Sequence, residues 1–265
     1  MATLVCFHAH PDDEAISTGG TMARAAADGH RVVLVLATQG EVGEVADGVL
    51  RPGETLGERR VAETRAAARI LGVERIEFLG YRDSGMMGEP TNDDALAFWR
   101  ADVDEAAGRL ASLLVDEEAE VLTSYDDHGG YGHPDHIQVH RVGRRASALA
   151  RVPRVYEATY NRTLIQRHMA ERPEMFPEEE VDPVEMETFG TPDEQITTAV
   201  DVSAVLDQKR RAMAAHSSQI GEQSFFLALS DPDFALAFGT EWFIRVDGGG
   251  DPMAGPGRRE TWLLG

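Results

Sequence analysis

Short apolar stretches alternate with longer helix-like stretches through the first 160 residues, and this alternation limits the possible folds more than any other feature. Apolar runs of 4–8 residues between turn residues are typical of buried strands, and they fall here at residues 3–7, 31–37, 75–79, 121–124 and 154–160. Helices are expected between them, at residues 15–28, 54–71, within 94–118 and at 137–150. Strands separated by helices of this length form parallel βαβ units. We therefore expect an α/β protein with a Rossmann-like, mostly parallel sheet and helices on both faces.

The alternation weakens after residue 160. Residues 171–195 are acidic and contain proline, so we expect an irregular loop or flap there. Helices are expected at 202–216 and 231–238, and a last strand at 241–246. The sequence thus predicts one domain over residues 1–265, with a Rossmann-like core at 1–160 and a C-terminal elaboration at 161–265 that forms an irregular cap.

The charge of the chain argues against several kinds of partner. The formal net charge is −21, whereas nucleic-acid binding depends on Lys and Arg that neutralise phosphates. There is no polybasic segment for a membrane surface, and no apolar run approaches the ~18 residues of a membrane span. Thr3 already begins a strand, so we expect no targeting segment ahead of it. Cys6 is the only cysteine and lies in an apolar strand, which fits a reducing cytoplasm.

Two clusters of acids and histidines follow predicted strands. The first is HAHPDDE at residues 8–14, where Pro11 prevents the strand from continuing. The second is YGHPDH at residues 131–136, beyond the fourth strand. Open α/β sheets bind ligands at the carboxyl ends of their strands, so both clusters are expected at one edge of the sheet. Together they predict a divalent metal site.

The residue types suit a hydrolytic zinc centre. Such centres typically use three His or Asp/Glu ligands and leave one position for water. His10, Asp13 and His136 supply such a set. Asp12 is then free to act as general base. His133, one helical turn from His136, would polarise a substrate carbonyl or protonate the departing amine.

Simpler structural roles compete for some of these side chains. Asp13 would serve as a helix cap and Asp12 as a turn former. His8 would pack in the core or support the ligands, and Asp135 would orient one of the imidazoles. The Asp-Asp-His sequence at 126–128 is a rival ligand set that a polar loop explains almost as well.

Two other functions use the same residues. A non-haem Fe(II) oxygenase would bind its metal through two histidines and one carboxylate, but such enzymes usually build this site on an antiparallel barrel. A non-catalytic sugar-binding module would keep the metal for structure, although structural zinc sites usually have four ligands, mostly Cys.

At the level of motifs, AHPDDE at 9–14 and HPDH at 133–136 resemble those of the PIG-L/LmbE family of zinc-dependent deacetylases. Within that family the chain is most similar to the mycothiol branch, which includes an N-acetylglucosaminyl-inositol deacetylase and a mycothiol S-conjugate amidase. The similarity continues at residues 40–41, 57–63, 81–86 and 216–219. It implies metal-dependent N-deacetylation of an N-acetylglucosamine-type amino sugar or a mycothiol-like conjugate. The implied cofactor is Zn²⁺, with Fe²⁺ as the alternative in the cell.

The resemblance also implies roles for individual residues. It makes His10, Asp13 and His136 the metal ligands and Asp12 the general base. His133 becomes the acid or the group that stabilises the oxyanion, and Tyr131 would help to stabilise the tetrahedral intermediate. Arg60 and Asp83 would bind substrate hydroxyls. Position 17 is Ser, whereas the conjugate amidase has a lysine nearby, which argues against mycothiol conjugates as substrates. Nothing in these motifs bears on the oligomeric state.

Overall fold

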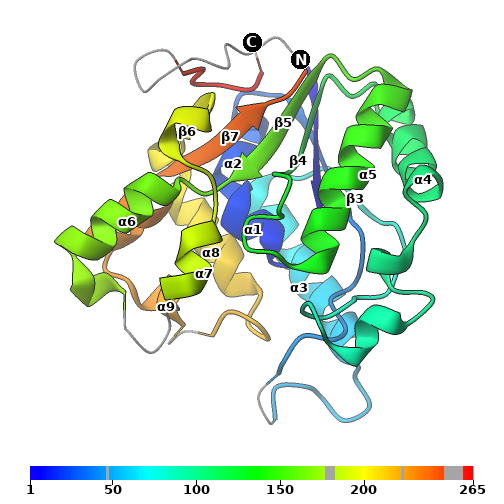
Figure 1. Ribbon diagram of the computed structural model, residues 1–265, viewed down its shortest axis with the longest axis horizontal. Helices are drawn as coiled ribbons and strands as arrows, with labels where there is room; N and C mark the ends of the chain where they lie inside the picture. The colour runs from blue at the N-terminus through cyan, green and yellow to red at the C-terminus, as the bar shows by residue number, and fades with distance from the viewer. Residues whose placement is uncertain (46–47, 177–182, 222–223, 248–258, 265) are drawn as a thin grey trace.

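A seven-stranded sheet forms the centre of the molecule in the computed structural model, which describes residues 1–45, 48–176, 183–221, 224–247 and 259–264 (Figure 1). Its strands lie in the order β3-β2-β1-β4-β5-β7-β6. They are β1 (Thr3–His8), β2 (Arg31–Leu36), β3 (Arg75–Phe78), β4 (Val121–Tyr125), β5 (Arg154–Thr159), β6 (Thr198–Asp201) and β7 (Thr240–Arg245). Strands β1 to β5 are parallel, whereas β7 is antiparallel to both β5 and β6. The expected Rossmann-like, mostly parallel sheet is confirmed.

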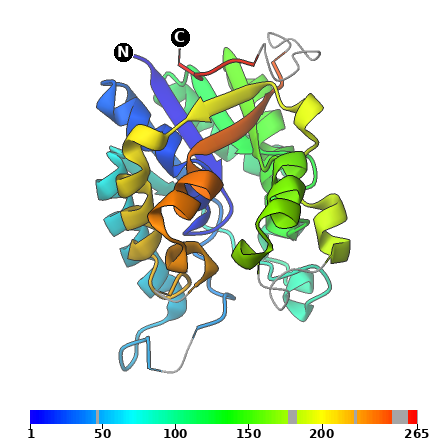
Figure 2. The same cartoon turned by 90° about the vertical axis from the view of Figure 1, so that its left-hand side faces the viewer.

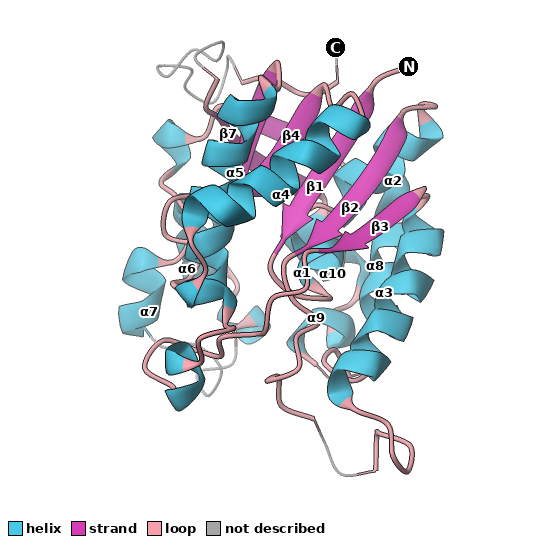
Figure 3. Cartoon of the chain, turned by 90° about the vertical axis from the view of Figure 1, so that its right-hand side faces the viewer, coloured by secondary structure: helices cyan, strands magenta, loops and turns pink. Residues whose placement is uncertain are grey.

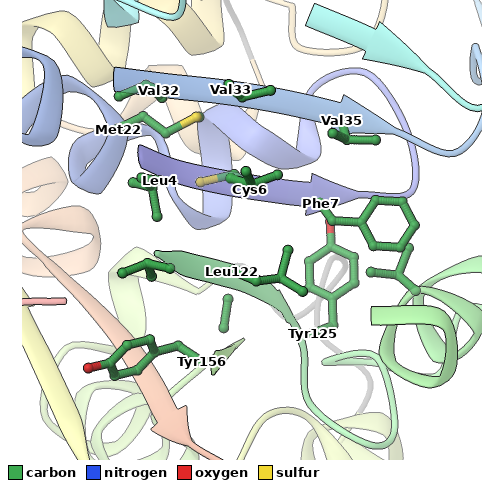
Figure 4. Close-up of a cluster of buried hydrophobic side chains, with 14 of the residues drawn as sticks. Leu4, Cys6, Phe7, Met22, Val32, Val33, Val35, Leu122, Tyr125 and Tyr156 are labelled. Atoms are coloured by element: carbon green, nitrogen blue, oxygen red, sulfur yellow. The ribbon is translucent and has the colours of Figure 1, made fainter. Parts of the chain in front are cut away.

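The central strand β1 shows why this sequence folds as a buried parallel sheet. It pairs with β2 on one side and β4 on the other, and Leu4, Val5, Cys6 and Phe7 are at most 1% exposed. A strand covered on both faces has apolar residues in succession instead of in alternation. Figure 4 shows several of these side chains packed with residues of β2, β4 and α2.

Two helical layers cover the sheet (Figure 3). Helices α4 (Val103–Asp116) and α5 (Pro134–Ala150) pack against each other on one face, and α2 (Gly19–Ala27), α3 (Leu56–Leu71) and α8 (Leu206–Ala215) pack together on the other. The other helices are α1 (Asp13–Ser17), α6 (Arg162–Glu171), α7 (Pro183–Thr188), α9 (Phe225–Ala228) and α10 (Asp231–Phe238). Turns of 3₁₀ helix occupy Pro90–Asp93, Phe98–Arg100, Pro173–Met175, Asp193–Gln195 and Ser203–Val205. Within the described residues, no helix combines the length and apolar character needed to cross a membrane.

Two predicted helix boundaries near the acid and histidine clusters were wrong. The helix expected at 15–28 is divided into α1 and α2 at Thr18, whose hydroxyl donates to the Glu14 carbonyl and so competes with the helical backbone pattern. Helix α5 begins at Pro134 instead of residue 137. Proline is favoured at the first position of a helix because its missing N–H would be unpaired there anyway. Residues 134–136 of the second cluster therefore lie in the first turn of α5, and His133 is its N-cap.

The C-terminal part is more regular than predicted (Figure 2). The expected helices and last strand correspond to α8, α10 and β7, but α6 and β6 were not predicted. Helix α6 has His168 as its only buried residue, and β6 is only four residues long. Part of the acidic segment at 171–195 forms α7 and two 3₁₀ turns, and residues 178–180 lie outside the described ranges.

One buried ion pair links the C-terminal strand β7 to the core helices. Lys209 of α8 lies 2.5 Å from Glu241 of β7, and both side chains are at most 2% exposed. The Glu241 carboxylate also accepts the backbone N–H groups of Gly20 and Thr21 at 2.8 and 2.7 Å. The pair thus fixes the start of α2 as well as β7.

Replacing Lys209 with Met is expected to destabilise the protein strongly, because it leaves the Glu241 charge buried without its partner. Loss of one partner of a buried pair costs about 3–5 kcal/mol, which corresponds to a Tm lower by roughly 6–20 °C for a chain of this size. Thermal unfolding measures this change. Arg211→Met, which removes an exposed ion pair with Asp207, serves as the control. A Tm within about 2 °C of the wild type for Lys209→Met, less than even a 1 kcal/mol loss would cause, would contradict the proposed role.

Candidate metal centre and active site

Polar loops from three strands meet at the carboxyl edge of the sheet, below the arrowheads in Figure 3. Residues 9–14 follow β1, residues 83–84 follow β3, and residues 126–136 follow β4 and enter α5. Side chains from all three segments are in contact there. The two clusters that the sequence places at one edge of the sheet therefore do lie together.

The three predicted metal ligands form a compact group around Asp13. Its Oδ2 lies 3.4 Å from Nδ1 of His10, and its Oδ1 lies 3.3 Å from Nε2 of His136. All three residues are at most 9% exposed. Burial alone would raise the pKa of Asp13, but the imidazoles of His136 and His10 outweigh it and hold this pKa well below its usual range.

Each imidazole of this group has its other nitrogen occupied. His10 Nε2 lies 3.1 Å from Asp135 Oδ2, and His136 Nδ1 lies 3.2 Å from the Gly129 carbonyl. Such contacts fix the tautomer and orientation of metal-binding histidines. His10 Nδ1 and His136 Nε2 therefore face Asp13, and His136 Nε2 is a buried nitrogen without a hydrogen-bond partner among the described residues.

These distances fit a divalent cation. Two ligand atoms on a tetrahedral zinc ion, with bonds of about 2.0–2.1 Å, lie about 3.3 Å apart. The Asp13–imidazole distances of 3.3 and 3.4 Å match this separation and exceed the usual length of a hydrogen bond. Three sets of possible ligand atoms lie within 4.8 Å of one another: His10 with His133 and His136, His10 with Asp83 and Asp135, and Asp126 with Asp127 and His128. His10 belongs to two of these sets and to the predicted trio, so the centre of the site is at His10.

Asp12 has an unusual backbone conformation at the start of α1. Its φ of 101° lies in the left-handed region, which is costly for a residue with a side chain. Asp12 occupies the N-cap position, yet its side chain makes no capping bond, so the carboxylate remains available. Burial raises the pKa of Asp12 to about 6, against the opposing charge of Arg60, whose Nη2 lies 3.3 Å from Asp12 Oδ2.

His133 is the N-cap of α5 and lies against both histidines of the predicted ligand set. Its ring centroid is 4.6 Å from that of His10 and 5.1 Å from that of His136. Its Nδ1 accepts the backbone N–H of Asp135 at 3.1 Å. Burial, together with these two imidazoles, lowers the pKa of His133 far below its ordinary value. The neutral ring therefore carries its proton on Nε2, as a hydrogen-bond donor.

The other three predicted site residues lie at the same edge of the sheet but differ in exposure. Tyr131 is 46% exposed, with its ring centroid 4.9 Å from that of His136. Asp83 is buried, 3.4 Å from His10 Nε2, and accepts the backbone N–H groups of Val42 and Gly85. Arg60 is also buried, and its guanidinium donates to the carbonyls of Pro11 and Gly40. Tyr131 thus borders solvent, whereas Asp83 and Arg60 hold loops around His10 and Asp12.

The rival set at residues 126–128 is bound into the loop structure. Asp126 accepts the backbone N–H of Gly130 at 2.7 Å and the hydroxyl of Thr159 at 2.6 Å. Both of its oxygens therefore stabilise the loop that leads to His133. His128 contacts Asp126 and Asp127 and is part of a surface hollow lined mostly by polar residues. A structural role explains this set without a metal.

Several residues of the site were not among the predicted site residues. Ser84 donates its backbone N–H to Asp135 and its hydroxyl to the other oxygen of the same carboxylate. Tyr125 stacks on His136 with a centroid distance of 4.5 Å and shares a hydrogen bond with His8. Two sequence signals were available: both residues lie at or just beyond the end of a strand, and Ser84 falls within the family-like residues 81–86.

Asp135→Asn is expected to lower zinc affinity by roughly 10–100-fold, the usual cost of losing an outer-sphere partner of a ligand histidine. The substitution weakens the charge that orients His10 without removing a ligand. Competition with a fluorescent chelator measures the affinity, and circular dichroism controls for folding. An unchanged affinity in the folded variant would show that Asp135 does not support the metal.

A largely apolar cavity of about 410 Å³ lies beside the site under the C-terminal helices. Ser17 and Tyr160 are among the residues that line it, and their hydroxyl groups lie 3.2 Å apart. Burial raises the pKa of Tyr160 to about 12, so its hydroxyl stays protonated. The cavity also includes Phe238 and Trp242, which come from segments far along the chain.

Comparisons with known proteins show what this chain is similar to. A family model described as PIG-L, GlcNAc-PI de-N-acetylase, matches residues 5–147. This range includes every metal ligand considered above. The fold also resembles that of the conserved protein TT1542 from Thermus thermophilus, with a TM-score of 0.57 and 23% identity over 92% of this chain and 94% of that one.

Curated relatives are similar over nearly their whole length. A protein of Thermomonospora curvata is 43% identical, covering 97% of this chain and 95% of its own. One of Acidothermus cellulolyticus is 44% identical, covering 100% and 95%. Both are named 1D-myo-inositol 2-acetamido-2-deoxy-alpha-D-glucopyranoside deacetylase.

Proposed function

The chain belongs to the PIG-L family, and from this we propose that it removes the acetyl group from 1D-myo-inositol 2-acetamido-2-deoxy-α-D-glucopyranoside. The protein is an amide-hydrolysing deacetylase, as the motifs predicted. The choice of substrate rests on the names of the relatives. The observation that carries the proposed chemistry is the buried carboxylate of Asp13 between two imidazole nitrogens, with Asp12 and His133 beside it.

We propose that His10, Asp13 and His136 hold one Zn²⁺ ion, with Fe²⁺ as the alternative in the cell. The support is the ligand spacing, the unpartnered His136 Nε2 and the fixed tautomers of both histidines. When bound, the cation supplies Lewis acidity that lowers the pKa of water and polarises an amide carbonyl. The oxygenase and non-catalytic alternatives lack such support, since the family and the relatives are those of deacetylases.

In this proposal Asp12 is the general base. Its carboxylate takes a proton from water as the water oxygen attacks the amide carbonyl carbon. The same proton then passes to the nitrogen of the amino sugar as the C–N bond breaks, which yields a free amine and acetic acid, and the acid then loses its proton to solvent as acetate. A base with a pKa near the working pH suits both transfers, and the carboxylate of Asp12 makes no capping bond that would compete.

His133 would act on the carbonyl oxygen. Its Nε2–H is free to donate because Nδ1 accepts from Asp135. A donor that is fixed before the reaction stabilises the negative charge that develops on this oxygen. Of the two roles that the sequence left open, the neutral ring favours oxyanion stabilisation over proton donation. Tyr131, at the solvent border beside His136, is proposed to assist.

We also propose that Asp83 and Arg60 contribute to the recognition of sugar hydroxyls, since both lie directly beside the reacting groups. The substrate is then a small amino sugar, and the net charge of −21 argues against nucleic-acid partners. Buried, unpaired Cys6 is consistent with our proposal of a cytoplasmic enzyme.

A panel of acetylated amines tests the function. Zinc-loaded protein is incubated with the inositol glucosaminide, with free N-acetylglucosamine and with an acetyl-lysine peptide, and amine release is measured. The inositol glucosaminide is expected to have the highest kcat/KM. The Asp12→Asn variant controls for contaminating activity. Rapid hydrolysis of the peptide with no reaction of either sugar would refute the proposal.

A further inference from the structure

Glu14 and His216 are buried residues that take no part in the catalytic steps proposed above. Glu14 contacts the backbone of Asp12, and His216 contacts Glu14. Glu14 Oε2 accepts the backbone N–H of Asp12 at 2.9 Å. Its other oxygen, Oε1, lies 2.6 Å from Nε2 of His216. Both side chains are fully buried. The Glu14 carboxylate therefore bridges His216 to the backbone of Asp12.

The Asp12 backbone needs such a support because of its conformation. Its φ of 101° is costly and persists only where surrounding contacts fix it. The Asp12 carbonyl accepts from Ala15 and Ile16 in the first turn of α1. Its N–H, at the other side of the residue, is held by Glu14. The direction of the Asp12 side chain thus depends on the position of the Glu14 carboxylate.

His216 is in turn anchored from a third segment of the chain. It directly follows α8, and the next residues, Ser217 and Ser218, bind the carboxylate of Glu63 on α3. The Ser218 N–H and hydroxyl donate to the two Glu63 oxygens at 2.9 and 2.6 Å. Helices α3 and α8 pack against each other. A continuous set of contacts therefore connects this helical layer to Asp12.

We propose that Glu14 and His216 are positioning residues that fix the backbone of Asp12 and so aim its carboxylate at the reacting water. This inference rests on the proposed function of Asp12 as general base. The hydrogen bond of the His216 side chain goes to Glu14 and not to a metal ligand, so His216 acts through Glu14. A misplacement of about 1 Å at a reacting group can cost about 10² in rate.

Two substitutions of His216 that differ only in reach test the proposal. The amide nitrogen of Gln can occupy the place of Nε2 and donate to Glu14, whereas Asn is one methylene too short. His216→Asn is expected to lower kcat by roughly 10–100-fold, with KM and zinc affinity changed less than about threefold. His216→Gln is expected to retain kcat within about threefold. Equal kcat values for the two variants would overturn the proposal.

A double-mutant cycle separates positioning from general damage to the site. Residues that act as a unit have strongly non-additive effects. In the Asp12→Asn background, His216→Asn is therefore expected to lower kcat further by less than about twofold. If the kcat losses of the two single variants multiplied in the double variant, His216 would act independently of Asp12. The same conclusion would follow if kcat fell in proportion to zinc affinity. Lys209→Met is the matched control, since it breaks another buried ion pair and is expected to lower Tm without a comparable loss of kcat.

Amide hydrogen exchange of Asp12, followed by NMR in the zinc-loaded protein, gives a readout that does not require turnover. The Asp12 N–H is expected to exchange at least about tenfold faster in His216→Asn than in the wild type, and close to the wild-type rate in His216→Gln, because local opening governs exchange. Unchanged exchange in His216→Asn would overturn the proposal. If no substrate is hydrolysed, the proposed function fails, and this measurement still decides whether the two residues hold Asp12.

Discussion

Replacing Asp12 with Asn is expected to lower kcat by about 10²–10⁴, the usual contribution of a general base, while one equivalent of zinc remains bound. The amide keeps the shape of the side chain but cannot take a proton from water. The Asp12 N–H contact with Glu14 and the proposed ligands His10, Asp13 and His136 are untouched by the change. Steady-state kinetics of amine release and metal analysis of the same sample measure the two quantities.

The zinc content distinguishes this result from a damaged site. Arg60 lies 3.3 Å from Asp12, so Asn also removes an ion pair, and thermal unfolding of the variant is a necessary control. If a folded, zinc-loaded Asp12→Asn enzyme turned over within about threefold of the wild type, well short of a general-base contribution, Asp12 would have no part in proton transfer.

His136→Ala is expected to abolish stoichiometric zinc binding and activity together. Among the three proposed ligands, His136 has the one buried imidazole nitrogen, Nε2, without a hydrogen-bond partner among the described residues. The substitution removes this nitrogen. The loss of affinity should exceed the roughly 10–100-fold that removal of an outer-sphere partner causes. Chelator competition measures the affinity, and activity is assayed at increasing zinc concentrations.

His128→Ala is the matched control for this variant. His128 also contacts two carboxylates, Asp126 and Asp127, but in the polar loop beyond β4. It is expected to keep one zinc per chain and near-normal turnover. If His128→Ala lost the metal and His136→Ala kept it, the metal site would lie at residues 126–128.

The periodicity of the sequence predicted the central sheet because its parallel strands are buried on both faces. Strands β1 and β2 have nearly continuous apolar runs, and a capping box at Thr55 and Glu58 marks the start of α3. Helix α6 was not predicted, and only one of its residues is buried. The pairing of β7 with both β5 and β6 joins segments too distant for local patterns to connect.

The residues of the site also divide into those that the sequence predicted and those that it did not. His10, Asp12 and Asp13 are neighbours in sequence, and so are His133 and His136, so two local clusters at one sheet edge predicted that they would meet. The supporting contacts join distant residues. Ser84 meets Asp135 across 51 positions, and His216 meets Glu14 across 202. Only the folded chain reveals these contacts, and they fix the tautomers and the backbone on which the proposed chemistry depends.

Zinc titration of the metal-free protein tests the central claim most directly. Chelator-treated protein is titrated with Zn²⁺ while amine release from 1D-myo-inositol 2-acetamido-2-deoxy-α-D-glucopyranoside is followed. Activity is predicted to be absent at the start, to rise linearly with added zinc and to reach its plateau at one equivalent per chain. Full activity in the metal-free protein, or no deacetylation at any zinc concentration, would contradict the account.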